Sequence, residues 1–268
     1  MGKTTLILVV VIGLLVAPRI YRGWQTDRLL RQKAAASLAH LDITGPAGQN
    51  RRGAVAVRGV SRRLTERQLS QLLAREARYP QLVLVWDWNG VRKATASAMG
   101  IDRRQHFVNS FLVDYQPFPA RQAWEPILTL ALRKTYVRDD RQYGGLLDVW
   151  QNSRQAFYFP TGDCEDHAIL LADWLIAMGL DARVVVGRYR DEGHAWVVYF
   201  EDGKTYLIEP TSKKRTRRHG LIPEASRMIH YHPSFQFNRE NFWVNTGSTF
   251  TTRYSGRQWI LKSRFVTS

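Results

Sequence analysis

The 268-residue chain has a single cysteine, Cys164. An internal disulfide is therefore impossible, and zinc sites built on CxxC pairs are excluded. Internal repeats and low-complexity tracts are also lacking. A lone thiol that no disulfide or zinc site requires is compatible with either redox compartment, and it is typical of a catalytic nucleophile.

Acidic residues are few beside basic ones, 23 against 39, and the formal net charge is +16. Such a balance suits an anionic partner such as membrane headgroups, nucleic acid or an acidic protein, although a basic surface that only maintains solubility explains it equally well. Aromatic residues interleaved with arginines near the C-terminus could stack on bases, but no nucleic-acid-binding motif accompanies them, so nucleic acid is not expected as a partner. The 44% hydrophobic content excludes a disordered chain.

Hydrophobic periodicity predicts helices over 65–79 and 120–136 and a strand over 81–88. The glycine- and proline-containing stretch 43–55 is typical of a linker or loop, and 102–118 shows no clear period.

The stretch 144–211 carries the clearest pattern. Asp163 caps a helix that begins at Cys164, has Asp166 in its first turn and ends before Gly179. Three strands follow, over 182–189, 194–200 and 204–209. A helix followed by an antiparallel meander predicts an α+β fold in which the cysteine-bearing helix packs on an antiparallel sheet.

A cysteine in the first turn of a helix lies at the positive end of the helix dipole, which favours the nucleophilic thiolate. The neighbouring carboxylates of Asp163, Glu165 and Asp166 oppose that effect, so a nearby imidazole is needed as a base. His194, at the start of the second predicted strand, is the candidate.

The tight-turn pair Asp202-Gly203 fixes which residues of the hairpin face each other. With a two-residue turn, residues whose numbers sum to 405 are opposite, so Trp196 faces Glu209. His194 and Glu209 then share one face of the sheet as diagonal neighbours, about 7–8 Å apart at Cα. Nucleophile, base and orienting carboxylate follow in the order Cys164, His194, Glu209.

Each residue alone has a second interpretation. Cys164 could be a small buried hydrophobic residue, His194 a strand-end residue and Glu209 a solvated charge. The coincidence of all three in order and on one face favours the catalytic interpretation. His230 and His232 alternate on one predicted strand without a third ligand, which favours a structural role.

The runs GDCEDHA and GHAW, and the carboxylate followed by Pro-Thr, resemble the transglutaminase-like superfamily. Asp148 and Trp150, in a D-x-W motif ending fourteen residues before Cys164, together with Gly162 to Asp166, are similar to the bacterial transglutaminase-like cysteine peptidases. The resemblance covers about 70 residues. It implies a papain-like fold and a Cys–His–Asp triad, in which this chain has Glu209 at the aspartate position.

The resemblance also implies that calcium could bind beside the cysteine, with Asp163, Glu165 and Asp166 as candidate ligands. Helix capping explains the same acids without a metal, and the thiol chemistry itself requires no cofactor. Trp150 is a candidate for lining the substrate cleft or the oxyanion pocket, or else a core residue.

The expected activity is hydrolysis of an amide in a protein or peptide through a thioester acyl-enzyme. Two alternatives stay open: a non-catalytic binding module that uses its basic surface, and an amine-accepting acyltransferase.

The N-terminus has an apolar run from Thr4 to Ala17 that follows Lys3, which predicts a signal peptide or signal anchor. It is shorter than the about 20 residues that usually span a bilayer, and no clean cleavage site follows. We expect an uncleaved anchor or transmembrane segment over 1–23, a helical and linker extension over 24–104 and a catalytic domain over 105–268. An inner-membrane anchor with a periplasmic catalytic domain is the expected location, although the arginines after the run favour the opposite orientation.

Overall fold

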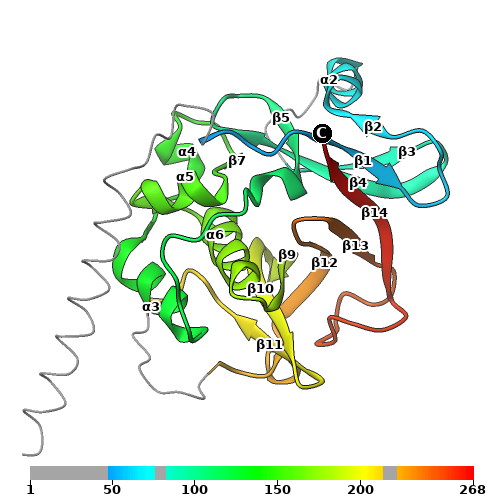
Figure 1. The fold of residues 1–268 in the computed structure, drawn as a ribbon. Helices are drawn as coiled ribbons and strands as arrows, with labels where there is room; N and C mark the ends of the chain where they lie inside the picture. The colour runs from blue at the N-terminus through cyan, green and yellow to red at the C-terminus, as the bar shows by residue number, and fades with distance from the viewer. Residues whose placement is uncertain (1–47, 76–82, 214–221) are drawn as a thin grey trace, which may run out of the picture. The chain divides into compact units, whose positions relative to one another are not determined.

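The computed structural model describes residues 48–75, 83–213 and 222–268 (Figure 1). The chain divides into two units, Met1–Leu41 and Asp42–Ser268, and every described residue belongs to the second. The predicted anchor over 1–23 lies outside the described residues and stays a prediction. Among the described helices, none has the length and apolar character needed to cross a bilayer.

The largest element is an eight-stranded sheet in which every neighbouring pair is antiparallel (Figure 1). Its strands, in spatial order, are β11 (Lys204–Ile208), β10 (Glu192–Glu201), β9 (Asp181–Tyr189), β12 (Tyr231–Phe237), β13 (Asn241–Asn245), β14 (Trp259–Thr267), β1 (Gly53–Val57) and β2 (Leu64–Thr65). The three strands that the sequence predicted after the cysteine are β9, β10 and β11, so the expected antiparallel meander is confirmed.

A smaller sheet contains β3 (Leu84–Trp88), β4 (Val91–Gly100) and β5 (Gln105–Phe107), and β7 (Val149–Trp150) runs parallel to β4. Two further short strands, β6 (Thr135–Tyr136) and β8 (Thr161–Gly162), also pair in parallel. This second pairing joins Tyr136 to Gly162, two residues before Cys164.

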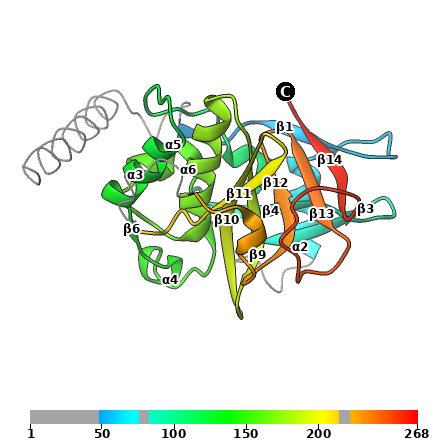
Figure 2. The same ribbon diagram turned by 90° about the horizontal axis from the view of Figure 1, so that it is seen from below.

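Helix α6 (Cys164–Ala177) packs against β9 and β10, with α3 (Trp124–Arg133) and α5 (Ser153–Tyr158) beside it (Figure 2). Every residue from Glu165 to Leu175 is buried, so the helix is enclosed on all sides rather than along one stripe. It ends before Gly179, whose φ of +89° suits a residue without a side chain. The predicted cysteine-bearing helix on an antiparallel sheet is confirmed.

The other described helical elements are α2 (Glu66–Arg75), α4 (Asp139–Gln142) and the 3₁₀ turns η2 (Val108–Phe111) and η3 (Ala225–Arg227). The helices predicted over 65–79 and 120–136 correspond to α2 and α3, although α3 is shorter at both ends. The unpatterned stretch 102–118 contains β5 and η2, which are too short to show a period.

Residues before position 105 do not stand apart from the predicted catalytic domain. Strand β1 pairs along its whole length with the C-terminal strand β14, from Gly53 opposite Thr267 to Val57 opposite Ser263. The apolar side chains Val55, Leu64 and Leu69 are fully buried in one cluster with residues of β3, β4, β5 and β14. The extension expected over 24–104 therefore includes, from Gly53 onward, strands of the same sheet. This pairing joins positions more than 200 residues apart, which local sequence patterns do not reveal.

Asp173, in the middle of α6, is fully buried and holds three parts of the fold together. Its carboxylate accepts hydrogen bonds from the Ser153 hydroxyl, the Tyr115 backbone N–H at 2.8 Å and Arg239 Nε at 2.6 Å. Burial raises the pKa of Asp173, and Arg239 acts in the opposite direction.

We expect Asp173→Asn to lower the free energy of unfolding by about 3 kcal/mol, because it leaves the Arg239 guanidinium without its buried partner. Asp191→Asn is the matched control, since Asp191 is 98% exposed and pairs with Arg188 at the surface. Denaturant unfolding of both variants checks this, and equal losses would contradict the buried pair's role.

Candidate active site

A cavity of about 520 Å³ lies at the start of α6. Cys164, His194 and Trp150 all line it, together with Tyr136 and Leu147, two apolar side chains that are 46% and 57% exposed. The structure therefore brings the predicted nucleophile and the predicted base to one solvent-accessible space.

The hairpin register predicted from the Asp202-Gly203 turn is confirmed. Val197 faces Ile208 and Glu201 faces Lys204, so paired residue numbers sum to 405. His194 and Glu209 meet as expected: His194 Nε2 lies 2.7 Å from Glu209 Oε2, and the two side chains are 15% and 24% exposed. Nδ1, the other ring nitrogen of His194, takes no part in this contact.

Both carboxylate oxygens of Glu209 have partners. Oε1 accepts hydrogen bonds from the backbone N–H and the hydroxyl of Thr211, and Oε2 also accepts one from the Tyr231 hydroxyl at 2.9 Å. Burial alone would raise the pKa of Glu209, but the hydrogen bonds from His194 and Thr211 outweigh it and hold the pKa below its ordinary value. The carboxylate is therefore ionised and fixed beside the imidazole.

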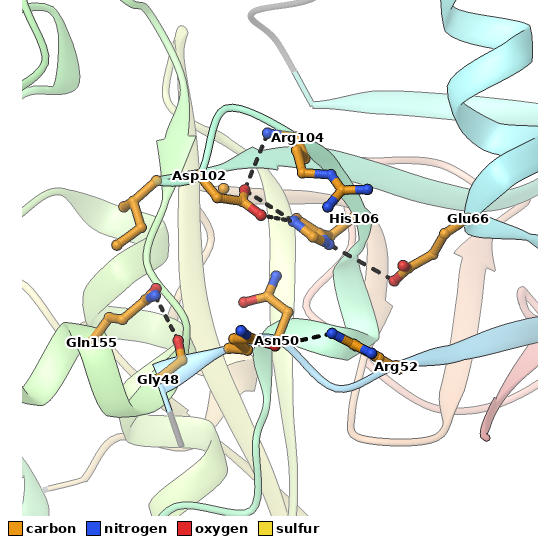
Figure 3. Close-up of a pocket in the computed structure, with 11 residues that line it drawn as sticks. Gly48, Asn50, Arg52, Glu66, Asp102, Arg104, His106 and Gln155 are labelled. Atoms are coloured by element: carbon orange, nitrogen blue, oxygen red, sulfur yellow. Dashed lines mark hydrogen bonds and ion pairs between the residues drawn. The ribbon is translucent and has the colours of Figure 1, made fainter. Parts of the chain in front are cut away.

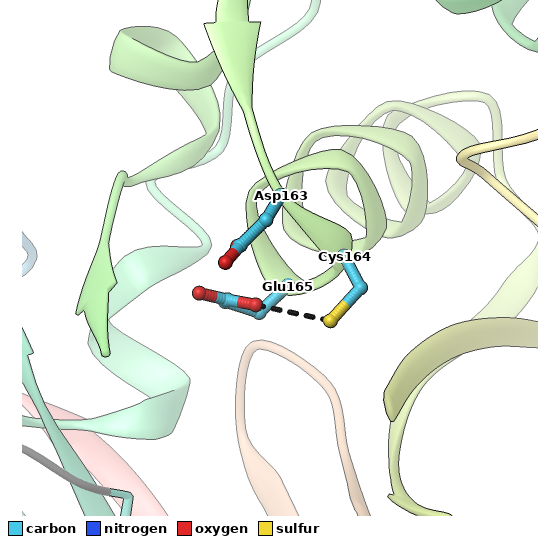
Figure 4. A group of neighbouring side chains, drawn as sticks. All are labelled: Asp163, Cys164 and Glu165. Carbon is cyan, nitrogen blue, oxygen red and sulfur yellow. Dashed lines mark hydrogen bonds between the residues drawn. The ribbon is translucent and has the colours of Figure 1, made fainter. Parts of the chain in front are cut away.

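Cys164 is the first residue of α6, and its thiol donates to Glu165 Oε2 at 3.2 Å (Figure 4). The backbone N–H of Ala195 also hydrogen-bonds the sulfur. The pairing of β10 with β11 begins at Val197, two residues after Ala195. Strand β11 therefore does not accept a hydrogen bond from the Ala195 N–H.

The helix dipole favours a thiolate at Cys164, and the carboxylates beside it oppose that effect, as the sequence indicated. Burial, and then the negative charge of Asp163, raise the pKa of Cys164 to about 12, against the opposing effect of its hydrogen-bond contacts with Glu165 and Ala195. Burial penalises any charged sulfur, and the dipole of one helix end does not offset that penalty.

Trp150 is 2% exposed; it stacks on Phe237 with ring centroids 6.1 Å apart and meets Phe111 edge-on at 5.4 Å. Its indole N–H donates to Asp148 Oδ1 at 2.5 Å. Trp150 lines the cavity, and the single N–H of its indole is already engaged with Asp148.

The three acids predicted as metal candidates are joined by two that the sequence analysis did not select as ligands, Asp139 and Asp148. Ligand atoms of Asp139, Asp163 and Asp166 lie within 4.8 Å of one another, as do those of Asp139, Asp148 and Glu165 and those of Asp163, Cys164 and Glu165. Asp166 is fully buried and does not line the cavity, whereas the other four acids do.

These carboxyl groups have raised pKa values because they are buried together. Burial, followed by the charge of Asp163, raises the pKa of Asp139 to about 8, and burial raises that of Asp148 to about 6. The pKa values of Glu165 and Asp166 are raised by burial and by the same neighbour. A bound cation would relieve both causes.

The donor set fits a hard divalent cation. Three buried oxygens have no hydrogen-bond partner: Asp139 Oδ1, Asp163 Oδ1 and Glu165 Oε1. Calcium takes six to eight oxygen ligands, mostly from carboxylates and carbonyls. The capping interpretation also holds, because the Asp163 backbone N–H donates to Asp166 Oδ2 at 3.3 Å.

Several contributors could not be found from local sequence. Tyr231 reaches Glu209 only because β12 pairs with β9, and Asp139 reaches the acid cluster from α4. Thr211 and Asp148, by contrast, lie within the Pro-Thr and D-x-W sequence motifs on which the family resemblance rests. His232 contacts Phe250 with ring centroids 4.6 Å apart, and no metal-type cluster among the described residues includes it or His230.

Residues 148–262, less than half of the chain, match the family model of the CEP76 peptidase-like domain. The chain is also 40% identical over 150 residues to the centrosomal protein of 76 kDa of Danio rerio, an alignment that covers 55% of this chain and 21% of that protein. The stretch that matches the family model, residues 148–262, contains Cys164, His194 and Glu209. The similarity to a peptidase-like domain agrees with the expected enzyme class in its coarse form, and it extends beyond bacterial proteins.

Among solved structures, Legionella pneumophila LapG is similar to 52% of this chain over 75% of its own length, at 20% identity and a TM-score of 0.38. Its calcium-bound form covers the same share of this chain and 76% of its own, at 18% identity and a TM-score of 0.37. TM-scores this low do not establish a common fold.

We expect Glu209→Gln to destabilise the protein at pH 7 and to have little effect in acid. A carboxylate whose pKa is lowered by folding contributes stability above its unfolded pKa, near 4.5, and loses it as the pH falls through the folded value. Denaturant unfolding at several pH values below 7 checks this. Glu201→Gln, at the exposed end of the same hairpin, is the control. A stability difference for Glu209→Gln that persists in strong acid would contradict the assigned ionisation.

Proposed function

We propose that the protein is a cysteine amide hydrolase of peptidase-like, transglutaminase-like type, with Cys164 as nucleophile, His194 as base and Glu209 as the group that orients the imidazole. The single observation that carries the proposal is the contact of 2.7 Å between His194 and Glu209 beside a cavity that also contains the chain's one thiol. A papain-like arrangement, and a protein or peptide as substrate, are parts of the same proposal.

In the proposed reaction the Cys164 thiol gives its proton to His194 as sulfur attacks the amide carbonyl carbon. The imidazolium, held by Glu209, then protonates the departing amine, and a thioester to Cys164 remains. Water attacks the thioester with His194 again taking a proton, and the carboxylic acid and the free thiol are released. The Ala195 backbone N–H, which contacts the sulfur, stabilises negative charge that develops there.

A thiol with a pKa near 12 is protonated at neutral pH, so the reaction depends on His194 as a general base during attack. A fixed carboxylate beside the imidazole stabilises the imidazolium that this proton transfer creates. Glu209, with four hydrogen-bonding contacts to its oxygens, supplies that fixed charge.

A second candidate function is supported by the same thiol. Its raised pKa and its hydrogen bond to Glu165 are also what an inactive, packed cysteine shows, which favours a non-catalytic binding module. An amine-accepting acyltransferase would use the same thioester, and product analysis with and without an added primary amine separates it from a hydrolase.

We expect wild-type protein to form a covalent adduct with a peptide-like electrophilic probe, and Cys164→Ala to form none while its Tm stays nearly unchanged. Cys164→Ser should lose almost all turnover, because a hydroxyl is a much weaker nucleophile at neutral pH. His194→Ala should slow adduct formation by about 100-fold, as expected for loss of a general base.

Intact mass spectrometry follows the adduct, and His230→Ala, a histidine outside the cavity, is the control. Equal labelling of wild type and His194→Ala would support the binding-module alternative.

We propose that calcium binds the acid cluster formed by Asp139, Asp148, Asp163, Glu165 and Asp166. Three of these side chains, Asp139, Asp163 and Glu165, each have a buried oxygen without a hydrogen-bond partner. When bound, the ion would supply positive charge that offsets the carboxylates around the sulfur. The proposal rests on the donor chemistry of these side chains.

We expect calcium to raise the Tm relative to protein in EGTA, since a ligand that binds only the folded state stabilises it. Asp139→Asn should weaken calcium binding by about tenfold or more through loss of one charged ligand. Asp140→Asn is the matched control, because the neighbouring Asp140 pairs with Arg138 and belongs to none of the clusters.

Calcium should also speed alkylation of Cys164 by iodoacetamide at fixed pH, because nearby positive charge favours the thiolate. An unchanged Tm in calcium and in EGTA would exclude the site.

A further inference from the structure

A second cavity, of about 370 Å³, lies between the segment leading into β1 and the turn that joins β4 to β5 (Figure 3). It shares no lining residue with the cavity at Cys164. Its size is within the range of about 300–1,000 Å³ that is usual for small-molecule sites. It is therefore a separate space that the proposed hydrolase reaction does not use.

The centre of this cavity is an ion cluster around His106. The Nε2 atom of His106 lies 3.0 Å from both carboxylate oxygens of Asp102, and Nδ1 lies 3.7 Å from Glu66 Oε1. Burial lowers the pKa of His106, but the two carboxylates outweigh it and raise the pKa to about 9. His106 is thus a cation at neutral pH, and both acids of the cavity are engaged with it.

Two further cations, Arg52 and Arg104, line the same cavity. Three positive groups, His106 and the two arginines, face two negative ones, Asp102 and Glu66, so the ionised side chains leave one net positive charge. Because the carboxylates are held against His106, the excess positive charge belongs to the arginines.

Asn50 adds a hydrogen-bond donor without a partner. Its Oδ1 accepts from Asn152 Nδ2 at 3.1 Å, whereas its buried Nδ2 has no partner. Figure 3 shows the Asn50 amide directed into the space below His106 and Asp102. A buried donor left unpaired costs free energy, and an acceptor placed in this cavity would remove that cost.

We propose that this second cavity binds a small oxyanion, a carboxylate or a phosphate group, between Asn50, Arg52 and Arg104. Planar guanidinium groups match the geometry of both anions, and charge-assisted hydrogen bonds to them are stronger than neutral ones. A ligand with one net negative charge would balance the net positive charge of the cavity.

The test is a titration of the full-length protein with inorganic phosphate and, separately, with acetate, at constant ionic strength set by chloride. Calorimetry should show saturable binding of at least one of the two anions, and the two titrations distinguish a phosphate ligand from a carboxylate ligand. Constant ionic strength removes the general screening expected for a chain with net charge +16.

Arg104→Gln should weaken this binding by about tenfold, because it removes one charged donor. Arg103→Gln is the matched control: Arg103 is the neighbouring exposed residue, the charge change is identical, and Arg103 does not line the cavity. Asn50→Asp keeps the acceptor used by Asn152 and replaces the free donor with a negative oxygen, so it should weaken binding at least as much.

Absence of saturable binding of both anions would overturn the proposal. An equal effect of Arg104→Gln and Arg103→Gln would overturn it as well, since it would show attraction to overall positive charge only. Neither result bears on Cys164, because the variants lie outside the cavity at the start of α6.

Discussion

The enclosure of α6 is the constraint on which the rest of the structure depends. A helix buried from Glu165 to Leu175 must satisfy each charge it carries. Asp173 does so with Arg239, Ser153 and a backbone N–H, and it is a structural group. At the start of the helix the acids are satisfied only in part, because Asp163 and Glu165 each keep one buried oxygen without a partner. The same burial that encloses the middle of α6 thus leaves carboxylate oxygens without hydrogen-bond partners beside Cys164.

Local rules predicted the features that depend on neighbours in sequence. The two-residue turn at Asp202-Gly203 determines the pairing of β10 with β11, and the period of two along each strand then places His194 and Glu209 together. The start and end of α6 follow from Asp163 and Gly179 in the same way. The longer side chain of Glu209 is accommodated because Thr211 and Tyr231 hold the carboxylate in place.

Features that depend on distant pairing were beyond local rules. Strand β1 joins β14, β12 joins β9 and α4 brings Asp139 beside Asp163, and none of these leaves a periodic signal in the sequence. The pKa of Cys164 depends on both kinds of information. The opposing charge of Asp163 is visible in the sequence, whereas the burial that raises the pKa most comes from the folded chain.

The carboxyl groups around the cavity consequently fall into two groups, one with a lowered pKa and one with raised pKa values. Glu209, with hydrogen-bond donors on both oxygens, has a lowered pKa and acts as a fixed charge for the imidazole. Asp139 and Glu165, with too few donors, have raised pKa values and share their low-dielectric surroundings with the thiol. Any process that neutralises this second group, by protons or by a cation, also makes the Cys164 thiolate easier to form. The proposed calcium binding and the proposed reactivity of the thiol would therefore both depend on one charge distribution, while the His194–Glu209 pair is stabilised separately by its own hydrogen bonds.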